Sequence, residues 1–546
     1  MRKKDERGYG ETESSRGSRR TGIRDSGRSS TGRSSRSDRN SSMNSSRTDR
    51  RDNPDRYDRI PETSNERSKN RQKKISRSAI IRPYRIVSFV SLALFASLIV
   101  YMVYFQINDS DALLNSPYNK RQEEAAQEII RGSILADDGT TALARTDTAD
   151  DGTETRVYPY GSLFAQSVGY SVYGGSGLES THNNDLIQSH SGIVTQMEND
   201  LNEQKKAGDN IVTTFNVPLQ QAAAAAMGDN SGAVVAMDVD TGSVLVDYSS
   251  PTYDPNTVEE NWDTLTNSDN GIFLNRATQG LYPPGSTFKI VTALAYLRQN
   301  GSFDNFSYNC TGTYENAGFT IHCYNYEAHG QETFASAFAN SCNCAFAYMS
   351  QNDIDKSTLR QTADDFGLNQ AVDTDLDVTT STFTLDTSTP DQLTMQTAIG
   401  QGDTRVTPLQ MCMIGQAVAN KGVMLKPYFV KSVVSAEGRT VKTTQTTTLK
   451  QVMDAGQAAN LTEAMRGVVQ GGTGTAIADL PYDIVGKTGT AEYDSAGHAH
   501  SWFVGFSNTG NNDIVVCAIV ENGGDGTAPA INVVRQVFAT YFGSES

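Results

Sequence analysis

Histidine and cysteine are scarce in this chain of 546 residues, which contains six of each. His322 and His329 lie near Cys310 and Cys323 and form a conceivable zinc set, but their spacing matches no established zinc motif. We therefore expect no metal and no cofactor. If any cysteines form a disulfide, Cys310 and Cys323 are the first candidates, because they flank a short loop.

The other four cysteines offer no obvious pairing. Cys342 and Cys344 would point to opposite faces of an extended segment. Cys412 and Cys517 lie in apolar runs, so we expect them to be buried free thiols.

Aliphatic side chains are almost missing from the first 78 residues, which are mainly Arg, Ser, Asp, Thr and Gly. Such a segment cannot bury enough apolar surface to fold, so residues 1–85 are predicted to be a disordered basic tail. Residues 1–85 carry 25 basic and 12 acidic residues, a net charge of +13. Residues 86–546 carry 22 basic and 51 acidic residues, a net charge of -29. Binding to anionic lipid headgroups is the first alternative to a solvated tail. Nothing supports nucleic-acid binding, because aromatic interleaving and a folded reader module are both lacking.

A run of 20 residues without a charge follows, from Ile86 to Phe105. At about 1.5 Å per residue it would span about 30 Å, the thickness of a bilayer core, so we predict a transmembrane helix. A cleaved signal peptide is disfavoured by the long leader, the length of the run and the lack of a small-x-small cleavage site. The positive-inside rule predicts a cytoplasmic N-terminus and an extracellular body, from basic residues before the run and acidic ones after it: Lys73, Lys74, Arg77, Arg82, Arg85, then Asp109 and Asp111.

Two folded regions are expected after this helix. Residues 107–210 have Gly- and Asp-rich turns and no long apolar run, which predicts a small, mainly β pedestal. Residues 211–546 are expected to form one α+β domain whose sheet is assembled from both ends, with helices between them. Its predicted elements are a hairpin at Gly232–Tyr248, helical patterns within 331–470, strands at Asp483–Ala491, Ser501–Phe506 and Ile514–Val520, and a helix at Ala530–Phe542.

Ser286-Thr287-Phe288-Lys289 begins an apolar helix directly after Pro283-Pro284-Gly285. The backbone N–H of Ser286 can donate to a developing oxyanion near the positive end of the helix dipole. Lys289 lies on the same helix face, and an apolar surrounding favours the neutral amine that could accept the serine proton. The motif by itself is weak evidence, because a helix N-terminal serine beside a solvated lysine would look the same.

A Lys-Thr-Gly-Thr sequence, Lys487 to Thr490, follows a strand-like segment. Alternation along a strand places the hydroxyls of Thr488 and Thr490 on one face, where they could bind a carboxylate beside the ammonium of Lys487. Gly489 would let a substrate backbone approach closely. An ordinary polar strand end is the alternative interpretation.

Ser341-Cys342-Asn343 lies between these motifs. S-x-N is a very weak signal, but this copy interrupts a helical pattern, as a loop facing a cleft would. Its hydroxyl could relay a proton and its amide could hold a peptide bond.

The ordered set S-x-x-K, S-x-N and K-T-G resembles the penicillin-recognising serine transpeptidases and β-lactamases. The resemblance covers about residues 115–546. It implies an α+β fold with an antiparallel sheet flanked by helices, an all-helical subdomain, a small mainly β pedestal and one transmembrane helix. The flanking segments are similar to those of class B penicillin-binding proteins: Asn275–Ala293, Gly232–Gly242, Pro251–Asn256, Gly486–Glu492 and Ser501–Phe506, with Asn119-Lys120-Arg121, Arg131–Ile134 and Gly177–Glu179 in the pedestal.

By this resemblance the chain is a peptidoglycan D,D-transpeptidase. Ser286 would attack the D-Ala-D-Ala carbonyl of a stem peptide, and Lys289 would take its proton. Ser341, with Lys487, would pass that proton to the departing D-Ala. An amine of a neighbouring stem would then resolve the ester, and β-lactams would acylate Ser286 as substrate mimics.

The resemblance also assigns the substrate contacts. Asn343 would position the acyl chain, Thr488 and Thr490 with Gly489 would line the carboxylate site, and the N–H groups of Ser286 and Thr490 would form the oxyanion hole. Lipid-linked precursors and a membrane glycan polymerase are the implied partners.

Two other functions fit the same motifs. One is a D,D-carboxypeptidase or β-lactamase, which would need a residue to activate water, and none is evident in the sequence. The other is a catalytically silent sensor of wall fragments, which would have no need for Lys289. The segment of about 100 residues before the catalytic domain is too short for the glycosyltransferase domain of bifunctional relatives.

Overall fold

The computed structural model describes residues 77–108, 128–202, 204–493, 497–524, 526 and 528–543. The predicted basic tail therefore lies almost wholly outside the described residues, as do Asn119-Lys120-Arg121. The chain divides after Val87 into two units, and this boundary falls within helix α1 (Arg77–Asn108). Among the described residues α1 is the one helix long and apolar enough to cross a membrane, over the 26 residues Ile81–Gln106. It contains the whole uncharged run predicted from the sequence.

A five-stranded antiparallel sheet forms the centre of the larger unit, in the order β17-β18-β19-β7-β8. It confirms the prediction that strands from both ends of the domain share one sheet. The strands are β7 (Gly232–Asp238), β8 (Val244–Ser250), β17 (Ile484–Glu492), β18 (Ala499–Ser507) and β19 (Ile514–Val520).

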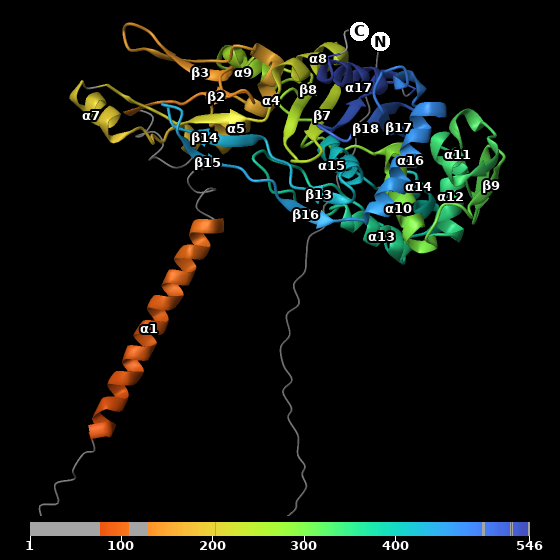
Figure 1. The fold of residues 1–546 in the computed structure, drawn as a ribbon, viewed down its shortest axis with the longest axis horizontal. Coiled ribbons are helices and arrows are strands. Elements are labelled where there is room, and N and C mark those ends of the chain that lie inside the picture. The colour runs from red at the N-terminus through yellow and green to blue at the C-terminus, as the bar shows by residue number, and fades with distance from the viewer. Residues whose placement is uncertain are drawn as a thin grey trace, which may run out of the picture. The chain divides into compact units, whose positions relative to one another are not determined.

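Helices cover both faces of this sheet (Figure 1). α8 (Val217–Met227) and α17 (Ala528–Tyr541) pack on one face, and α15 (Pro408–Ala419) packs on the other. Alternate residues of one strand therefore enter two different cores: Val234 and Ala236 join the cluster with α17, and Ala233 and Val235 join the cluster with α15. Burial on both faces explains why β7 and β19 are almost continuously apolar in the sequence.

A helical subdomain lies between the two halves of the sheet sequence. Four short strands among its helices pair as β9–β12 and β10–β11, a detail that the resemblance did not imply. The α+β fold class is confirmed. The helices are α10 (Lys289–Asn300), α11 (Phe334–Ala339), α12 (Asn343–Asn352), α13 (Lys356–Asp365), α14 (Asp391–Ala398) and α16 (Ala455–Gly471), and the strands are β9 (Ser307–Cys310), β10 (Thr313–Asn316), β11 (Phe319–His322) and β12 (Gly330–Thr333). Helix α9 (Val258–Thr266) lies apart from them, where Val258 and Trp262 pack with Tyr170 and Tyr253.

The pedestal contains a six-stranded sheet in the order β15-β14-β6-β2-β3-β4. β14 (Val430–Val434) and β15 (Thr440–Thr443) come from the sequence of the catalytic region, so the sheet takes strands from both sides of the boundary predicted at residue 210. A separate pair joins β13 (Val423–Leu425) to β16 (Thr448–Gln451). The remaining elements are β1 (Ile129–Ile130), β2 (Ile134–Leu135), β3 (Ala142–Thr148), β4 (Glu154–Val157), β5 (Lys206–Ala207) and β6 (Asn210–Thr213), with α4 (Ala165–Val168), α5 (Gly177–Thr181), α6 (Asn183–Leu186) and α7 (Ile193–Leu201).

Buried charges hold the pedestal together. The Glu179 carboxylate is fully buried and accepts from Nε of Arg131 and of Arg156, each at 2.7 Å. Burial raises the pKa of Glu179, but the charges and hydrogen bonds of the two arginines outweigh it, so the net shift of that pKa is downward. The carboxylate therefore stays ionised in the interior.

A partly buried histidine, His182, links α6 to a later loop and to β14. Nδ1 of His182 lies 2.8 Å from Asp185, and Nε2 lies 3.5 Å from Asp375. Burial lowers the pKa of His182, but hydrogen bonds to the two aspartates outweigh it and raise the pKa to about 9. Asp375 also accepts the backbone N–H groups of Phe429 and Val430, so the contact reaches the first residue of β14.

Candidate active site

Ser286 and Lys289 lie at the junction of a 3₁₀ turn, η3 (Gly285–Phe288), with helix α10. The sequence predicted an α-helical start, whereas the structure has the tighter turn, in which residues i and i+3 are aligned. The Lys289 Nζ atom lies 3.1 Å from the Ser286 Oγ atom. Ser286 is partly exposed, while Lys289 is fully buried, so the serine faces solvent and the amine lies behind it.

The amine of Lys289 contacts both polar residues of the S-x-N motif. Nζ lies 2.7 Å from the Ser341 carbonyl oxygen, 3.2 Å from Ser341 Oγ and 2.7 Å from Asn343 Oδ1. The carbonyl and amide oxygens can only accept hydrogen bonds, so they take two N–H groups of the amine. In the neutral amine, the remaining lone pair is then available to a hydroxyl proton.

The environment of Lys289 favours this neutral form. Burial lowers its pKa from 10.5 to about 8, against a smaller opposing effect of the thiols of Cys342, Cys323 and Cys344. The Phe346 ring lies 5.3 Å from Nζ. A pKa of about 8 leaves roughly a tenth of the amine neutral at pH 7.

Ser341 and Cys342 lie between α11 and α12, where the sequence predicted a break in a helical pattern, and Asn343 is the first residue of α12. Ser341 has a φ of +54°, which is uncommon for a residue other than glycine. Hydrogen bonds hold the turn on both sides: Ser341 N donates to Phe338 O at 3.2 Å, and Cys342 N donates to Ala337 O at 2.8 Å. The Asn343 side chain also donates to the carbonyl oxygen of His322 at 3.1 Å.

Lys487 comes from strand β17 and is fully buried. Burial holds its pKa well below the ordinary value, and the charge of Lys289 lowers it further. Its Nζ atom donates to the Thr488 carbonyl oxygen at 3.1 Å and lies 5.7 Å from the Phe338 ring. Within the described part of the chain it makes no hydrogen bond to Ser341, so the structure does not join the two groups that the resemblance pairs.

Sequence reasoning missed Thr473. Its hydroxyl lies 2.5 Å from that of Thr488, and its backbone N–H donates to the Ala339 carbonyl oxygen at 3.1 Å. It therefore joins the K-T-G strand to the end of α11, beside the S-x-N turn. The sequence feature that could have identified Thr473 is the glycine-rich segment Gly471-Gly472-Thr473-Gly474, at which helix α16 ends.

Glycines bring the K-T-G strand against the S-x-x-K turn. A Cβ atom at Gly489 would lie 2.9 Å from the Thr287 methyl carbon, and one at Gly285 would lie 2.4 Å from the Thr490 carbonyl oxygen. From the sequence, we expected the lack of a side chain at Gly489 to let the substrate backbone approach closely. The structure adds that its missing side chain lets the turn carrying Ser286 pack onto β17.

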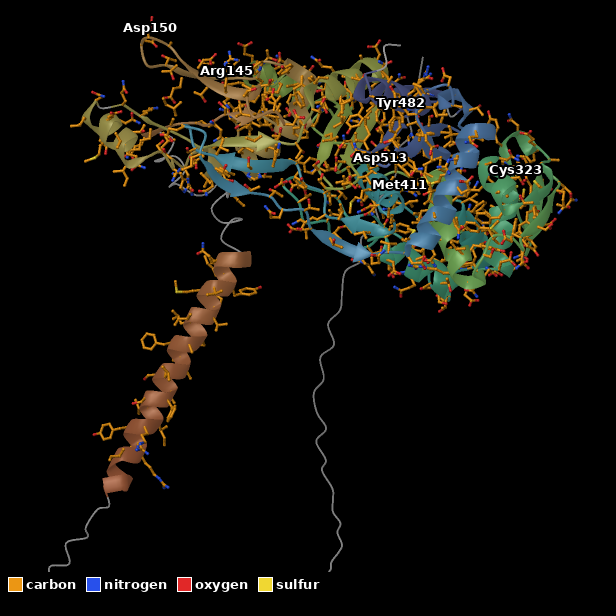
Figure 2. The ribbon with its side chains drawn as sticks, viewed as in Figure 1. Arg145, Asp150, Cys323, Met411, Tyr482 and Asp513 are labelled. Carbon is orange, nitrogen blue, oxygen red and sulfur yellow. The ribbon has the colours of Figure 1, made fainter. Side chains whose placement is uncertain are left out.

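The two cysteines of the predicted disulfide are buried free thiols in the structure. Their Sγ atoms, on Cys310 and Cys323, lie 3.7 Å apart, whereas a disulfide bond measures about 2.05 Å. Cys342 and Cys344 do not point to opposite faces, because α12 begins here and the segment is not extended; both contact Cys323, at 3.6 and 3.4 Å. Cys323 lies in the helical subdomain (Figure 2).

Two family profiles match the chain. The penicillin binding protein transpeptidase domain matches residues 232–539, which include all three motifs and more than half of the chain. The penicillin binding protein A dimerisation domain matches residues 131–211, most of the pedestal.

Curated relatives cover most of the chain. The peptidoglycan D,D-transpeptidase PbpA of Mycobacterium tuberculosis is 32% identical over 470 residues, a match that covers 81% of this chain and 94% of the relative. The peptidoglycan D,D-transpeptidase MrdA of Acinetobacter baumannii is 26% identical over 445 residues, covering 70% of this chain and 65% of the relative.

Solved structures have the same fold. The D,D-transpeptidase domain of a peptidoglycan glycosyltransferase from Eggerthella lenta matches with a TM-score of 0.68 and 33% identity, covering 76% of this chain and 99% of that one. Penicillin-binding protein A from M. tuberculosis, as its imipenem acyl-enzyme complex, matches with a TM-score of 0.70 and 29% identity over the same shares. The chain therefore belongs to the penicillin-binding protein transpeptidase family, in its class B branch.

Proposed function

We propose that this protein is a peptidoglycan D,D-transpeptidase that works through an acyl-enzyme on Ser286. The observation that carries the proposal is the buried amine of Lys289, which lies within hydrogen-bond distance of Ser286 Oγ and of both S-x-N side chains. The relatives named above are D,D-transpeptidases, and one of them is known as a β-lactam acyl-enzyme. D-Ala-D-Ala stem peptides and β-lactams are the corresponding substrates and inhibitors.

Acylation begins with the neutral amine. Lys289 accepts the Ser286 hydroxyl proton while Oγ attacks the carbonyl carbon of the penultimate D-Ala. The new C–O bond places a negative charge on the former carbonyl oxygen. The N–H groups of Ser286 and Thr490 stabilise that charge, and the contact between Gly285 and the Thr490 carbonyl supports this assignment because it places the two backbones side by side.

The proton must then reach the leaving group. Lys289 lies 3.2 Å from the Ser341 hydroxyl, which can receive a proton from the ammonium and donate its own to the amine of the departing D-Ala. The C–N bond breaks, and the ester remains on Ser286. Lys487 is the second group that the family resemblance assigns to this transfer, and its Nζ atom donates to the Thr488 carbonyl oxygen at 3.1 Å.

Deacylation repeats these steps with an acceptor amine. The amine attacks the ester carbonyl, loses a proton to Ser341 and Lys289, and expels Ser286 Oγ, which takes that proton back. Asn343 positions the acyl chain through its amide, and the hydroxyls of Thr488 and Thr490 bind the terminal carboxylate of the donor. Thr473 would hold the Thr488 hydroxyl in place.

A hydrolase on the same fold is the competing function. It would need a group that deprotonates water at the ester. Within the described part of the chain, no carboxylate hydrogen-bonds to Ser286, Lys289, Ser341 or Asn343. The absence of such a carboxylate among the hydrogen-bond partners of these four residues supports transfer to an amine rather than to water.

We further propose that α1 anchors the protein with its N-terminus in the cytoplasm and its catalytic unit outside the cell. Arg82 and Arg85 precede the uncharged run, and Asp109 and Asp111 follow it, as the positive-inside rule requires. A membrane glycan polymerase that supplies uncross-linked strands is the partner proposed from the family resemblance.

Fluorescent penicillin tests the serine assignment on the full chain in detergent. The wild type and the control Ser357→Ala, which changes an exposed serine of α13, should be labelled equally. Ser286→Ala should not be labelled. Equal labelling of Ser286→Ala would refute the acyl-enzyme.

Transfer and hydrolysis are separated by product analysis. Glycan strands polymerised from lipid-linked precursors should yield cross-linked dimeric stems with release of D-Ala. If only tetrapeptide stems accumulate, or β-lactam is hydrolysed rapidly, the hydrolase function holds instead.

A further inference from the structure

The turn that follows α14, residues 399–402, contacts both of the motifs that carry the oxyanion donors. The carbonyl oxygen of Gly400 accepts the backbone N–H of Gly285, the residue before Ser286, at 2.9 Å. A Cβ atom at Gly400 would lie 2.0 Å from the Gly285 carbonyl oxygen, so this turn packs directly against the catalytic one. The next residue, Gln401, reaches the K-T-G strand.

The side-chain amide of Gln401 pairs with the backbone of Glu492 on β17. With the amide oriented so that both bonds form, its nitrogen donates to the Glu492 carbonyl oxygen at 3.0 Å, and its oxygen accepts the Glu492 N–H at 3.1 Å. A primary amide presents a donor and an acceptor side by side, as a neighbouring strand does. Gln401 therefore pairs with β17 as one residue of an added strand would.

This pairing determines which backbone groups of β17 face the open edge of the sheet. β17 is the first strand in the sheet order, so one of its sides has no strand partner in the described part of the chain. Successive residues of a strand direct their N–H and C=O groups to opposite sides. Because Glu492 faces the open side, Thr490 and Thr488 face it as well. The close approach of the Thr490 carbonyl oxygen to Gly285 agrees with this direction.

The 399–402 turn is itself anchored to the helix that carries Lys289. The Thr292 hydroxyl of α10 donates to the Ala398 carbonyl oxygen at 2.8 Å. The backbone N–H of Gln401 donates to the Gln396 carbonyl oxygen at 2.9 Å. A side chain on such a supported turn can hold its partner more precisely than one on a free loop.

We propose that Gln401 is a positioning residue for acylation, a role that rests on the transpeptidase function proposed above. Its amide holds Glu492, and so fixes the N–H of Thr490 two positions earlier on the same strand. Gly400 holds the other donor, the N–H of Ser286, through the neighbouring Gly285. One short turn thus sets the separation of the two groups that stabilise the oxyanion.

The effect of Gln401 should appear in the transition state rather than in binding. The carbonyl oxygen gains its negative charge only when Ser286 Oγ attacks, so the noncovalent complex makes little use of the oxyanion hole. An interaction made in the transition state changes the acylation rate and leaves the dissociation constant. Removing one oxyanion donor costs about 100- to 1000-fold, so a loosened donor should cost about 10- to 100-fold.

Stopped-flow acylation by a fluorescent penicillin separates rate from binding on the full chain in detergent. Gln401→Ala should lower the limiting acylation rate about 10- to 100-fold and change the dissociation constant of the noncovalent complex less than about threefold. The control Gln361→Ala changes an exposed glutamine of α13 and should match the wild type. An unchanged rate in Gln401→Ala, or an equal loss in both constants, would overturn the positioning role.

The wild type distinguishes failure of this role from failure of the proposed function. Absence of labelling in the wild type would overturn the acyl-enzyme on Ser286 and the role of Gln401 with it. Labelling of the wild type with no effect of Gln401→Ala would overturn the role of Gln401 alone.

Gln401→Glu tests the hydrogen bonds separately from packing, because the two side chains have nearly the same shape. An ionised carboxylate accepts the Glu492 N–H but repels the Glu492 carbonyl oxygen, whereas a carboxylic acid can donate to that oxygen. Relative to the wild type at the same pH, the variant should acylate about tenfold more slowly at pH 8 and within about threefold at pH 5. The comparison at equal pH cancels the titration of Lys289. A ratio that does not change with pH would refute the amide pair, even if Gln401→Ala fails to fold.

The acyl carbonyl reports the two donors directly. Hydrogen bonds from the oxyanion hole lower the stretching frequency of the Ser286 ester carbonyl, which infrared difference spectroscopy with a ¹³C-labelled penicillin carbonyl can detect. Gln401→Ala should move this band to higher frequency, and Gln361→Ala should leave it in place. A band that stays in place in Gln401→Ala would show that the donors have not moved and would refute the proposal.

Discussion

The rate of Ser286 acylation should depend on pH through the buried amine of Lys289. Only the neutral amine can accept the serine proton, so the rate follows the neutral fraction of this one group. Burial lowers its pKa from 10.5 to about 8. Because the pKa is lowered, the active form is scarce at acidic pH, increases through about pH 8 and is complete above it.

The size of the effect follows from that pKa. At pH 7 the neutral fraction would be about 0.03% with a pKa of 10.5 and about 9% with a pKa of about 8, an increase of about 300-fold. This corresponds to about 3.4 kcal/mol in the availability of the base. Between pH 6 and pH 9 the neutral fraction should increase about 90-fold, from about 1% to about 91%.

Stopped-flow acylation by a fluorescent penicillin measures this dependence. The second-order rate constant should increase about tenfold per pH unit below 8 and level off above it. Ser286→Ala controls for alkaline hydrolysis of the probe, and Lys289→Arg should be slow at every pH, because a guanidinium keeps its proton. A flat profile between pH 6 and 9, or an inflection near 10.5, would refute a buried lysine base.

Three further predictions concern packing and buried charge. Gly489→Ala would place a methyl group against Thr287, so it should destabilise the fold by about 1–3 kcal/mol and slow acylation. The control Gly471→Ala has open space around it and should change neither the thermal unfolding midpoint nor the rate of penicillin labelling. Glu179→Gln removes the buried carboxylate between two partly buried arginines and should cost about 3–5 kcal/mol in chemical unfolding. A loss under about 1 kcal/mol would contradict a stabilising ion-pair triad. His182, with a pKa raised to about 9, stabilises the fold fully below its unfolded pKa of 6.5, and this stability is lost as the pH increases through about 9. The unfolding midpoint should therefore decrease between pH 7 and 10 in the wild type and not in His182→Asn.

The sequence predicted those parts of the protein whose geometry is local. The spacing of Ser286 and Lys289 places both side chains on one face of any helical turn, whatever surrounds it. The uncharged run of α1 and the apolar strands β7 and β19 were recognisable because burial on both faces, or in a membrane, requires continuous apolar sequence.

The predictions failed where a contact joins distant segments. Cys342 and Cys344 were placed on opposite faces because two residues alternate on a strand, but the start of α12 brings both thiols to Cys323. Thr473 was missed because its partner lies on another element. Strands β14 and β15 join the pedestal sheet, although more than 200 residues of sequence separate β14 from its partner β6.

The sequence by itself thus determined the inventory of chemical groups: one serine–lysine pair, two further motifs, and a set of cysteines with no familiar spacing. The tertiary structure decided which groups meet. It buried Lys289 and so lowered its pKa, packed Ser286 against β17 through Gly285 and Gly489, and gathered thiols from three segments behind the S-x-N turn. Desolvation and packing depend on atoms from the whole domain, and no local pattern of residues contains them.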